Sequence, residues 1–152
     1  MTPDKILIPV NGNGCDDDAL RLASDIAKGN GKAKVYAVYV IEVKRDLPLD
    51  AEISQETSKA ERALHHLEQL GRELKCPVEA TLLQARDVGP AVVQEAVEQG
   101  VELIVMQMNY KRRFGLFSMG DTAPYILKNA PCQVILCREA IPAGAQKGRG
   151  RG

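Results

Sequence analysis

The sequence predicts an α/β fold of the doubly wound class, in which a parallel sheet carries helices on both faces. Five short runs rich in apolar residues alternate along the chain with four segments whose apolar residues recur at helical spacing. The first run is continuously apolar, which is typical of a strand covered on both faces. Alternating strands and helices imply parallel strands joined by right-handed crossovers. We therefore expect a five-stranded parallel sheet between two layers of helices, a three-layer sandwich.

The predicted elements follow one another without a long gap. The five predicted strands cover residues 5–10, 34–43, 78–84, 102–107 and 133–137. The four helical stripes between them consist of Ala19, Leu22, Ala23, Ile26 and Ala27; Ala60, Ala63, Leu64, Leu67, Leu70 and Leu74; Val92, Val93, Ala96 and Val97; and Ile126, Leu127 and Ala130. Helix-stopping residues come after each stripe, namely Gly29 and Gly31, Pro77, Gly100 and Pro131.

Length and composition predict one domain with a short basic tail. The chain has 152 residues, of which 45% are hydrophobic, enough for one domain with its own core. The last six residues, 147–152, hold three basic residues and no acid, whereas the rest carries 17 basic against 20 acidic residues. We expect residues 1–140 to form the domain and 141–152 to be a disordered tail.

Composition also argues against two classes of partner. With 4% aromatic residues and no Trp, the chain lacks the rings of a base-stacking surface, and its slightly acidic body does not fit DNA. The longest apolar run, residues 35–41, is far shorter than the roughly 20 residues that span a bilayer. The N-terminus has no secretory signal pattern. We expect a cytoplasmic protein without a specific nucleic-acid or membrane partner.

Few side chains suggest catalysis or metal binding. The four cysteines form no C-x-x-C pair and are expected to be reduced and mostly buried. His65 and His66 are adjacent, so on a helix they point about 100° apart, whereas metal-binding histidines favour i, i+4 spacing. The acidic run 16–18 is the one candidate for a metal, and its place at a helix N-terminus explains it as capping. We therefore predict no catalytic residues and no metal site.

A ligand of a doubly wound sheet binds beyond the carboxyl ends of the strands, where the strand order reverses. The candidate site therefore consists of residues just after Val10, Val40 and Met106. After the first strand, Gly12 and Gly14 fit two places of a dinucleotide fingerprint, but Asp17 stands in the third and would repel a pyrophosphate. This segment is interpreted as a tight strand-to-helix turn.

Several segments, in their order and spacing, resemble the universal stress protein family. They are the run 6–10 that ends in Pro9 and Val10, Val40 at the end of the second strand, the run 101–106, Gly120 before the last helix, and the run 129–132 before the last strand. The likeness covers nearly all of residues 4–138. It implies a flavodoxin-like or adenine nucleotide alpha hydrolase-like sheet, homodimers, and a division of members into those that bind ATP and those that do not.

The resemblance also indicates where a nucleotide would bind. Members that bind ATP carry G-x2-G-x9-G followed by Ser or Thr, and the equivalent positions here are Gln107, Tyr110 and Gly120, followed by Asp121. Asn11 replaces the acidic residue expected after the first strand. The positions that match the family around the nucleotide are Pro9, Val40, Met106 and Gly120.

Side-chain chemistry favours a weakened nucleotide site. Gln107 and Tyr110 carry Cβ atoms where the backbone must approach a phosphate closely. Asp121 is expected to be the N-cap of the last helix, so that its carboxylate accepts a backbone N–H and fills the anion site from within. A capping box from Ser118 to Asp121 is disfavoured, because it would move Pro124 past the first turn. The cations at 111–113 argue the other way, since they can recover an anionic ligand.

The first hypothesis is a non-catalytic stress-response protein that acts as a dimer through protein partners, with weak or absent ATP binding and no cofactor. The alternative is a sensor that binds ATP or AMP through a degenerate phosphate loop. A slow nucleotide hydrolase is a third class, and it requires a metal site that the sequence does not place. The last strand, residues 133–137, is expected at a sheet edge, where its unpaired backbone and apolar side chains would pair with a second copy.

Overall fold

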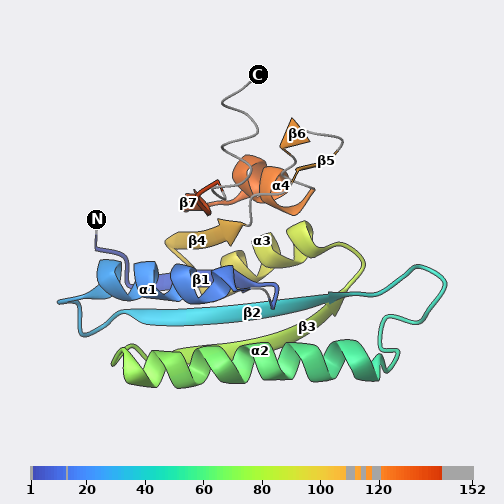
Figure 1. Cartoon of the computed structure of the whole chain (residues 1–152), viewed down its shortest axis with the longest axis horizontal. Coiled ribbons are helices and arrows are strands. Elements are labelled where there is room, and N and C mark those ends of the chain that lie inside the picture. The colour runs from blue at the N-terminus through green and yellow to red at the C-terminus, as the bar shows by residue number, and fades with distance from the viewer. Residues whose placement is uncertain (1, 13, 109–111, 114–115, 118–120, 142–152) are drawn as a thin grey trace.

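The structure, a computed structural model, describes residues 2–12, 14–108, 112–113, 116–117 and 121–141. The main sheet is parallel throughout, and its strands follow the order β3-β2-β1-β4-β7 (Figure 1). In chain order the elements are β1 (Lys5–Val10), α1 (Cys15–Ala27), β2 (Lys34–Glu42), α2 (Ser54–Glu73), β3 (Val78–Ala85), α3 (Val88–Gln99), β4 (Leu103–Met108), β5 (Arg112–Arg113), β6 (Leu116–Phe117), α4 (Thr122–Asn129) and β7 (Gln133–Arg138).

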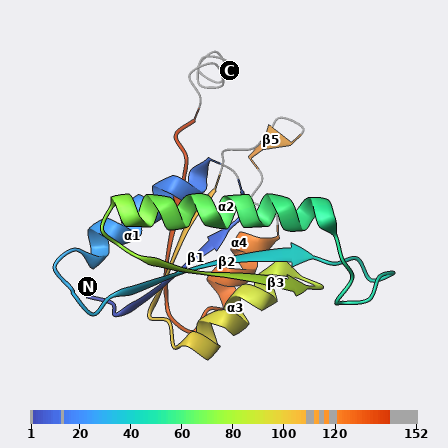
Figure 2. The same cartoon turned by 90° about the horizontal axis from the view of Figure 1, so that it is seen from below.

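Two hydrophobic cores lie on opposite faces of this sheet. One joins alternate residues of β1, β2 and β4 to α1 and α2, and it includes Ile6, Ile8 and Leu67. The other joins the intervening strand residues to α3 and α4, and it includes Leu7 and Ile126. Figure 2 shows α2 on one side of the strands and α3 on the other. The predicted three-layer, doubly wound architecture is confirmed, because successive strand residues point to opposite faces and both faces are apolar.

The predicted strands and helices are all present in the described residues, with bounds that differ by a few residues. Two positions of the predicted helical stripes are wrong. Val97 in α3 is 55% exposed and Leu127 in α4 is 47% exposed. Each follows a fully buried residue, Ala96 or Ile126, and a helix turns by about 100° per residue, so the next side chain leaves the contact with the sheet. The buried faces of α3 and α4 therefore include fewer residues than the apolar stripes in the sequence.

The segment after β4 contains a short antiparallel pair that is not among the five strands expected from the sequence. Arg112 pairs with Phe117 and Arg113 with Leu116, which forms the two-stranded sheet β5-β6. Three residues of the expected nucleotide site lie outside the described residues. They are Lys111, a cation that could bind an anionic ligand, and Tyr110 and Gly120, two positions of the family's phosphate loop. The predicted basic tail also lies outside the described residues, except for Ile141.

The connection from β2 to α2, residues 43–53, extends beyond the sheet and is held by two side chains from the end of β3 (Figure 1). Arg86 Nη1 donates hydrogen bonds to the carbonyl oxygens of Lys44 at 2.6 Å and Leu47 at 2.8 Å. Gln84 Nε2 donates to the carbonyl oxygens of Leu49 at 2.8 Å and Ala51 at 3.0 Å. The Lys44 carbonyl oxygen also accepts the backbone N–H of Leu47 at 3.0 Å, so these side-chain bonds add to a turn that the connection forms itself.

The strand order reverses at β1, which lies between β2 and β4. The chain leaves β1 toward the face that carries α1, whereas the helix that follows β4 covers the opposite face. The carboxyl ends of β1 and β4 are therefore the point at which a doubly wound sheet opens a crevice. In the described parts of the chain, no helix is both long enough and apolar enough to cross a membrane.

Candidate functional site

The turn that follows β1 is closed by a buried carboxylate from the first turn of α1. Asp16 is only 6% exposed. Its Oδ2 accepts the backbone N–H of Gly12 at 2.8 Å, and its Oδ1 accepts that of Asn11 at 3.3 Å. Gly12 has a φ of +83°, a left-handed conformation that residues with a Cβ adopt at a cost. The backbone thus curls around the Asp16 carboxylate as it would around an external anion.

Burial dominates the protonation of this carboxyl group. Loss of solvation raises the pKa of Asp16 from 3.8 to about 6, although the two backbone hydrogen bonds and His66 favour the ionised form. The neighbouring Asp17 carboxylate adds to the rise. Asp16 therefore changes its charge in a pH range in which ordinary aspartates stay ionised.

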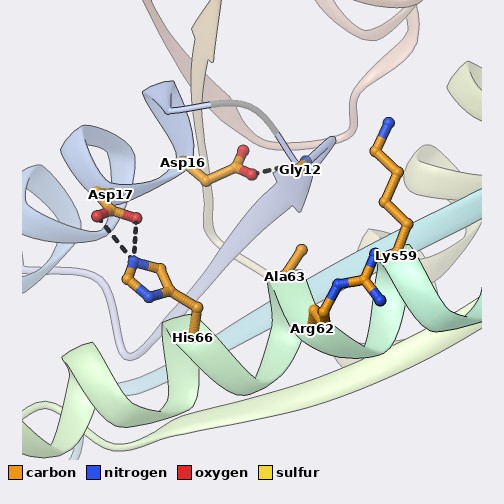
Figure 3. A pocket seen from close by; sticks show the side chains of 7 residues that line it. All are labelled: Gly12, Asp16, Asp17, Lys59, Arg62, Ala63 and His66. Carbon is orange, nitrogen blue, oxygen red and sulfur yellow. Dashed lines mark hydrogen bonds and ion pairs between the residues drawn. The ribbon is translucent and has the colours of Figure 1, made fainter.

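A pocket of about 360 Å³ lies between this turn and α2 (Figure 3). Its lining residues come from the β1–α1 segment, namely Gly12, Asp16 and Asp17, and from α2, namely Lys59, Arg62, Ala63 and His66. Across the pocket, His66 Nε2 contacts the two carboxylate oxygens of Asp17 at 2.9 and 3.0 Å. This pair connects the two helices on the outer side of the pocket.

Lys59 lies against the turn itself. A Cβ built on Gly12 would come within 3.2 Å of Lys59 Cε, 3.5 Å of Tyr39 Cε2 and 3.7 Å of the Tyr39 hydroxyl oxygen. In Figure 3, Gly12 lies between Asp16 on one side and Lys59 on the other. The missing side chain of Gly12 therefore provides the room through which Lys59 reaches the carboxyl end of β1.

A model of the universal stress protein family matches residues 3–138 of the chain, which includes every element of the main sheet. The chain belongs to the universal stress protein family. A universal stress protein of Methanocaldococcus jannaschii is 28% identical over 141 residues, which cover 89% of this chain and 82% of that protein.

Solved structures of the family share the fold. A universal stress protein of Archaeoglobus fulgidus, 22% identical, superposes with a TM-score of 0.69 over 90% of this chain and 94% of that chain. A structure from the same organism in complex with dAMP, also 22% identical, gives 0.68 over 90% and 98%. A family protein of Arabidopsis thaliana with AMP bound, 16% identical, gives 0.69 over 95% and 99%.

Most of the family's predicted nucleotide positions fall around the strand ends. Pro9 is half-buried in β1, and Val40 and Met106 are buried in β2 and β4. Asn11 is exposed directly after β1. Gln107 is half-buried within β4, in register with Cys137 of β7. The assignment of these residues to a nucleotide stays a prediction.

The predicted role of Asp121 needs correction. Asp121 is the residue that precedes α4, as expected, but its side chain makes no capping hydrogen bond. Its backbone carbonyl accepts the N–H of Tyr125 at 3.2 Å, so the helix begins without help from the carboxylate. The exposed Asp121 carboxylate does not fill the anion position by bonding to the helix N-terminus.

The acidic run 16–18 also does more than cap a helix. Asp16 turns inward to the β1–α1 turn and Asp17 pairs with His66, so the run does not converge on one point. Among the residues that the structure describes, no three His, Cys, Asp or Glu side chains are grouped to hold a metal ion. The four cysteines are free, and Cys15 is the buried one.

Two features of the pocket were missed at the level of sequence. Asp16 falls three residues before Ala19 and seven before Ala23, which puts it on the buried stripe of α1. This spacing could have predicted the burial of Asp16 from the sequence. The pairing of His66 with Asp17 had no such signal, because it joins residues 49 positions apart.

Proposed function

We propose that this universal stress protein is a non-catalytic, cytoplasmic stress-response protein that acts as a homodimer through protein partners and binds ATP weakly or not at all. The observation that carries the proposal is the backbone at Gln107. This residue replaces the first glycine of the family's phosphate loop, and it pairs within β4 in register with Cys137. The next residue, Met108, is still strand, in register with Arg138.

Strand backbone with side chains at this point is a poor phosphate cradle. A phosphate loop requires backbone N–H groups that curl toward the anion, and glycine allows that curl and the close approach. The exposed Asp121 carboxylate would also meet a phosphate with like charge. Each unfavourable contact costs about 1–3 kcal/mol, so two or three of them suffice to remove a micromolar site.

Calorimetry with ATP, with and without magnesium, tests this proposal. The wild-type protein should bind with a Kd no tighter than about 1 mM. The triple variant Gln107→Gly, Tyr110→Gly, Asp121→Ser restores the family's pattern and should bind ATP at least about tenfold more tightly. Low-micromolar binding by the wild type would overturn the proposal.

The alternative is a nucleotide-binding sensor, and it rests on the neighbouring structures that hold AMP, dAMP or cAMP. A nucleoside monophosphate brings one phosphate group to the phosphate loop, whereas ATP brings three. Parallel titrations with AMP and cAMP therefore separate the two candidates. Micromolar binding of either monophosphate, with amide shifts at residues 107 and 121–123 and without ATP binding, would favour the sensor.

The homodimer is proposed through β7. This strand ends the sheet order and pairs only with β4 among the described strands. Val134, Ile135 and Leu136 are only half-buried there. An open parallel edge with apolar side chains is a template for a second copy, and one two-fold contact closes both edges.

Light scattering at micromolar concentration should give about twice the chain mass for this dimer. Ile135 packs against the core on the face of the sheet that carries α1 and α2, so Ile135→Lys must be checked by circular dichroism for folding. A folded Ile135→Lys monomer supports the interface. Amide hydrogen exchange gives a second test without mutation, since exchange in β7 should slow as protein concentration rises. A wild-type monomer at all concentrations contradicts the proposal.

A further inference from the structure

The pocket between α1 and α2 adjoins the crevice in which the family resemblance places a nucleotide, but it is lined by other residues. None of its lining residues is one of the family positions Pro9, Asn11, Val40, Met106, Gln107, Gly120 or Asp121. We infer that this pocket is a second ligand site, which binds the phosphate group of a small phosphomonoester through Lys59, Arg62 and the hydroxyl of Tyr39.

Two cations of the pocket have no partner among the residues that the structure describes. Lys59 and Arg62 both line it, and within the described residues neither makes a hydrogen bond or an ion pair. They are three residues apart on α2, so they project from the same side of the helix. An ammonium and a guanidinium side by side offer several donors for phosphate oxygens.

The acids of the pocket, by contrast, are already engaged. Asp16 accepts the backbone N–H groups of Asn11 and Gly12. Asp17 contacts His66. Among the residues that line the pocket, the charged groups without a partner are therefore the Lys59 and Arg62 cations, which favours an anion as the ligand.

The hydroxyl of Tyr39 is a further donor close to Gly12, at one end of the pocket. Tyr39 is only 6% exposed, and its hydroxyl oxygen would lie 3.7 Å from a Cβ built on Gly12. Across the described part of the chain this hydroxyl has no hydrogen-bond partner, although it is not sealed from solvent. Because this hydroxyl reaches solvent, it can donate a hydrogen bond to a ligand without giving up a bond within the chain.

The Tyr39 hydroxyl is protonated, as a hydrogen-bond donor must be. Burial raises the pKa of the Tyr39 hydroxyl, and the Glu56 and Asp16 carboxylates raise it further. The group therefore stays protonated at neutral pH and donates its hydrogen bond. Donation to a phosphate oxygen would give Tyr39 the partner that it lacks.

The pocket is larger than a free phosphate needs. Its volume of about 360 Å³ falls within the range of small-molecule sites. A phosphate at Lys59 and Arg62 leaves space along Ala63 for an organic group, such as a sugar. The proposed ligand is therefore a phosphomonoester, and inorganic phosphate alone should bind more weakly.

Amide chemical shifts of the full-length protein provide the test, with inorganic phosphate and AMP as separate probes. Both probes should shift residue 12 and residues 59–66, with AMP binding more tightly. The double variant Lys59→Ala, Arg62→Ala should weaken binding at least about tenfold, and Tyr39→Phe about threefold to tenfold. The control Arg72→Ala, Lys128→Ala removes the same charge from exposed positions elsewhere and should leave binding unchanged.

Three results would overturn the inference. The first is the absence of any shift at residues 12 and 59–66 up to about 50 mM phosphate or AMP. The second is unchanged binding in the Lys59→Ala, Arg62→Ala variant. The third is an equal loss in the control, which would indicate a general charge effect. AMP binding in the family's crevice would instead shift residues 107 and 121–123 and leave residues 59–66 unchanged, so the two sites are distinguished in one titration.

Discussion

Two aspartates stand at the starts of helices that follow neighbouring strands, and the structure uses them in opposite ways. Asp16, in the first turn of α1, is buried and accepts two backbone N–H groups of the turn after β1. Asp121, directly before α4, is exposed and makes no capping bond. The same residue type at the same kind of position therefore organises one turn and leaves the other to solvent.

The difference shows that the helix dipole favours an acidic residue at the N-terminus but does not determine which hydrogen bonds its carboxylate makes. Both positions have the favourable end of the helix dipole nearby. Only at Asp16 does the preceding turn present two amides within reach, because Gly12 takes a left-handed conformation. The β1–α1 turn thus holds an anion of its own on the backbone N–H groups of Asn11 and Gly12.

The largest expected effect is on the pH dependence of stability. The pKa of Asp16 is raised from 3.8 to about 6 by burial, so the folded state holds its proton more tightly than the unfolded state. This contribution is fully present below pH 4 and is lost as the pH rises through about 6. A shift of this size corresponds to about 3 kcal/mol of unfolding free energy.

Asp16→Asn isolates that contribution, since it removes the titration and keeps a side-chain carbonyl. Relative to the wild type, the variant should gain stability as the pH rises from about 4 to 7, by up to about 3 kcal/mol. Urea denaturation at several pH values measures the difference. A flat difference, or one of opposite sign, would mean that the two hydrogen bonds outweigh the cost of burial.

The second prediction contrasts the two aspartates as hydrogen-bond acceptors. Asp16→Ala should be about 1–3 kcal/mol less stable than Asp16→Asn, because the N–H groups of Asn11 and Gly12 lose their acceptor. Asp121→Ala and Asp121→Asn should agree within about 0.5 kcal/mol, since no capping bond exists to lose. Denaturation of the four variants at one pH gives both differences. An equally large gap at Asp121 would restore its predicted role as a side-chain cap.

Sequence patterns were sufficient for the fold but only partly for the site. The continuous apolar run of β1 and the stripe of α2 predicted buried elements because burial on a sheet depends on spacing that is visible in the chain. The burial of Val97 and Leu127 was predicted wrongly, because a run of apolar residues does not show which of them lies at the edge of the buried helix face. The open hydroxyl of Tyr39 depends on contacts between β2, α2 and the β1–α1 turn, which no local pattern encodes.

The third prediction concerns the glycines that shape the Asp16 turn. Gly12→Ala should cost about 1–2 kcal/mol, because its φ of +83° is strained for a residue with a Cβ and Lys59 Cε would lie only 3.2 Å away. Gly14 precedes α1 with a φ of −65° and has open space around it. Gly14→Ala should therefore change the unfolding free energy by less than about 0.5 kcal/mol. Thermal unfolding of both variants tests whether the turn conformation, rather than glycine content, holds Asp16 in place.

The smallest expected effect belongs to the neighbouring acid, Asp17. Its contact with His66 joins α1 to α2 at 2.9 Å, but both side chains are partly exposed to solvent. His66→Ala should cost only about 0.2–1 kcal/mol at low ionic strength, and the loss should shrink in high salt. His65→Ala is the matched control, because His65 is the adjacent exposed residue on the same helix and should have almost no effect. If His66→Ala costs more than about 2 kcal/mol, the exposed pair supports the first turn of α1 as strongly as the buried Asp16 does. In that case a buried and an exposed acid in the same helical turn, Asp16 and Asp17, would contribute similarly to the unfolding free energy.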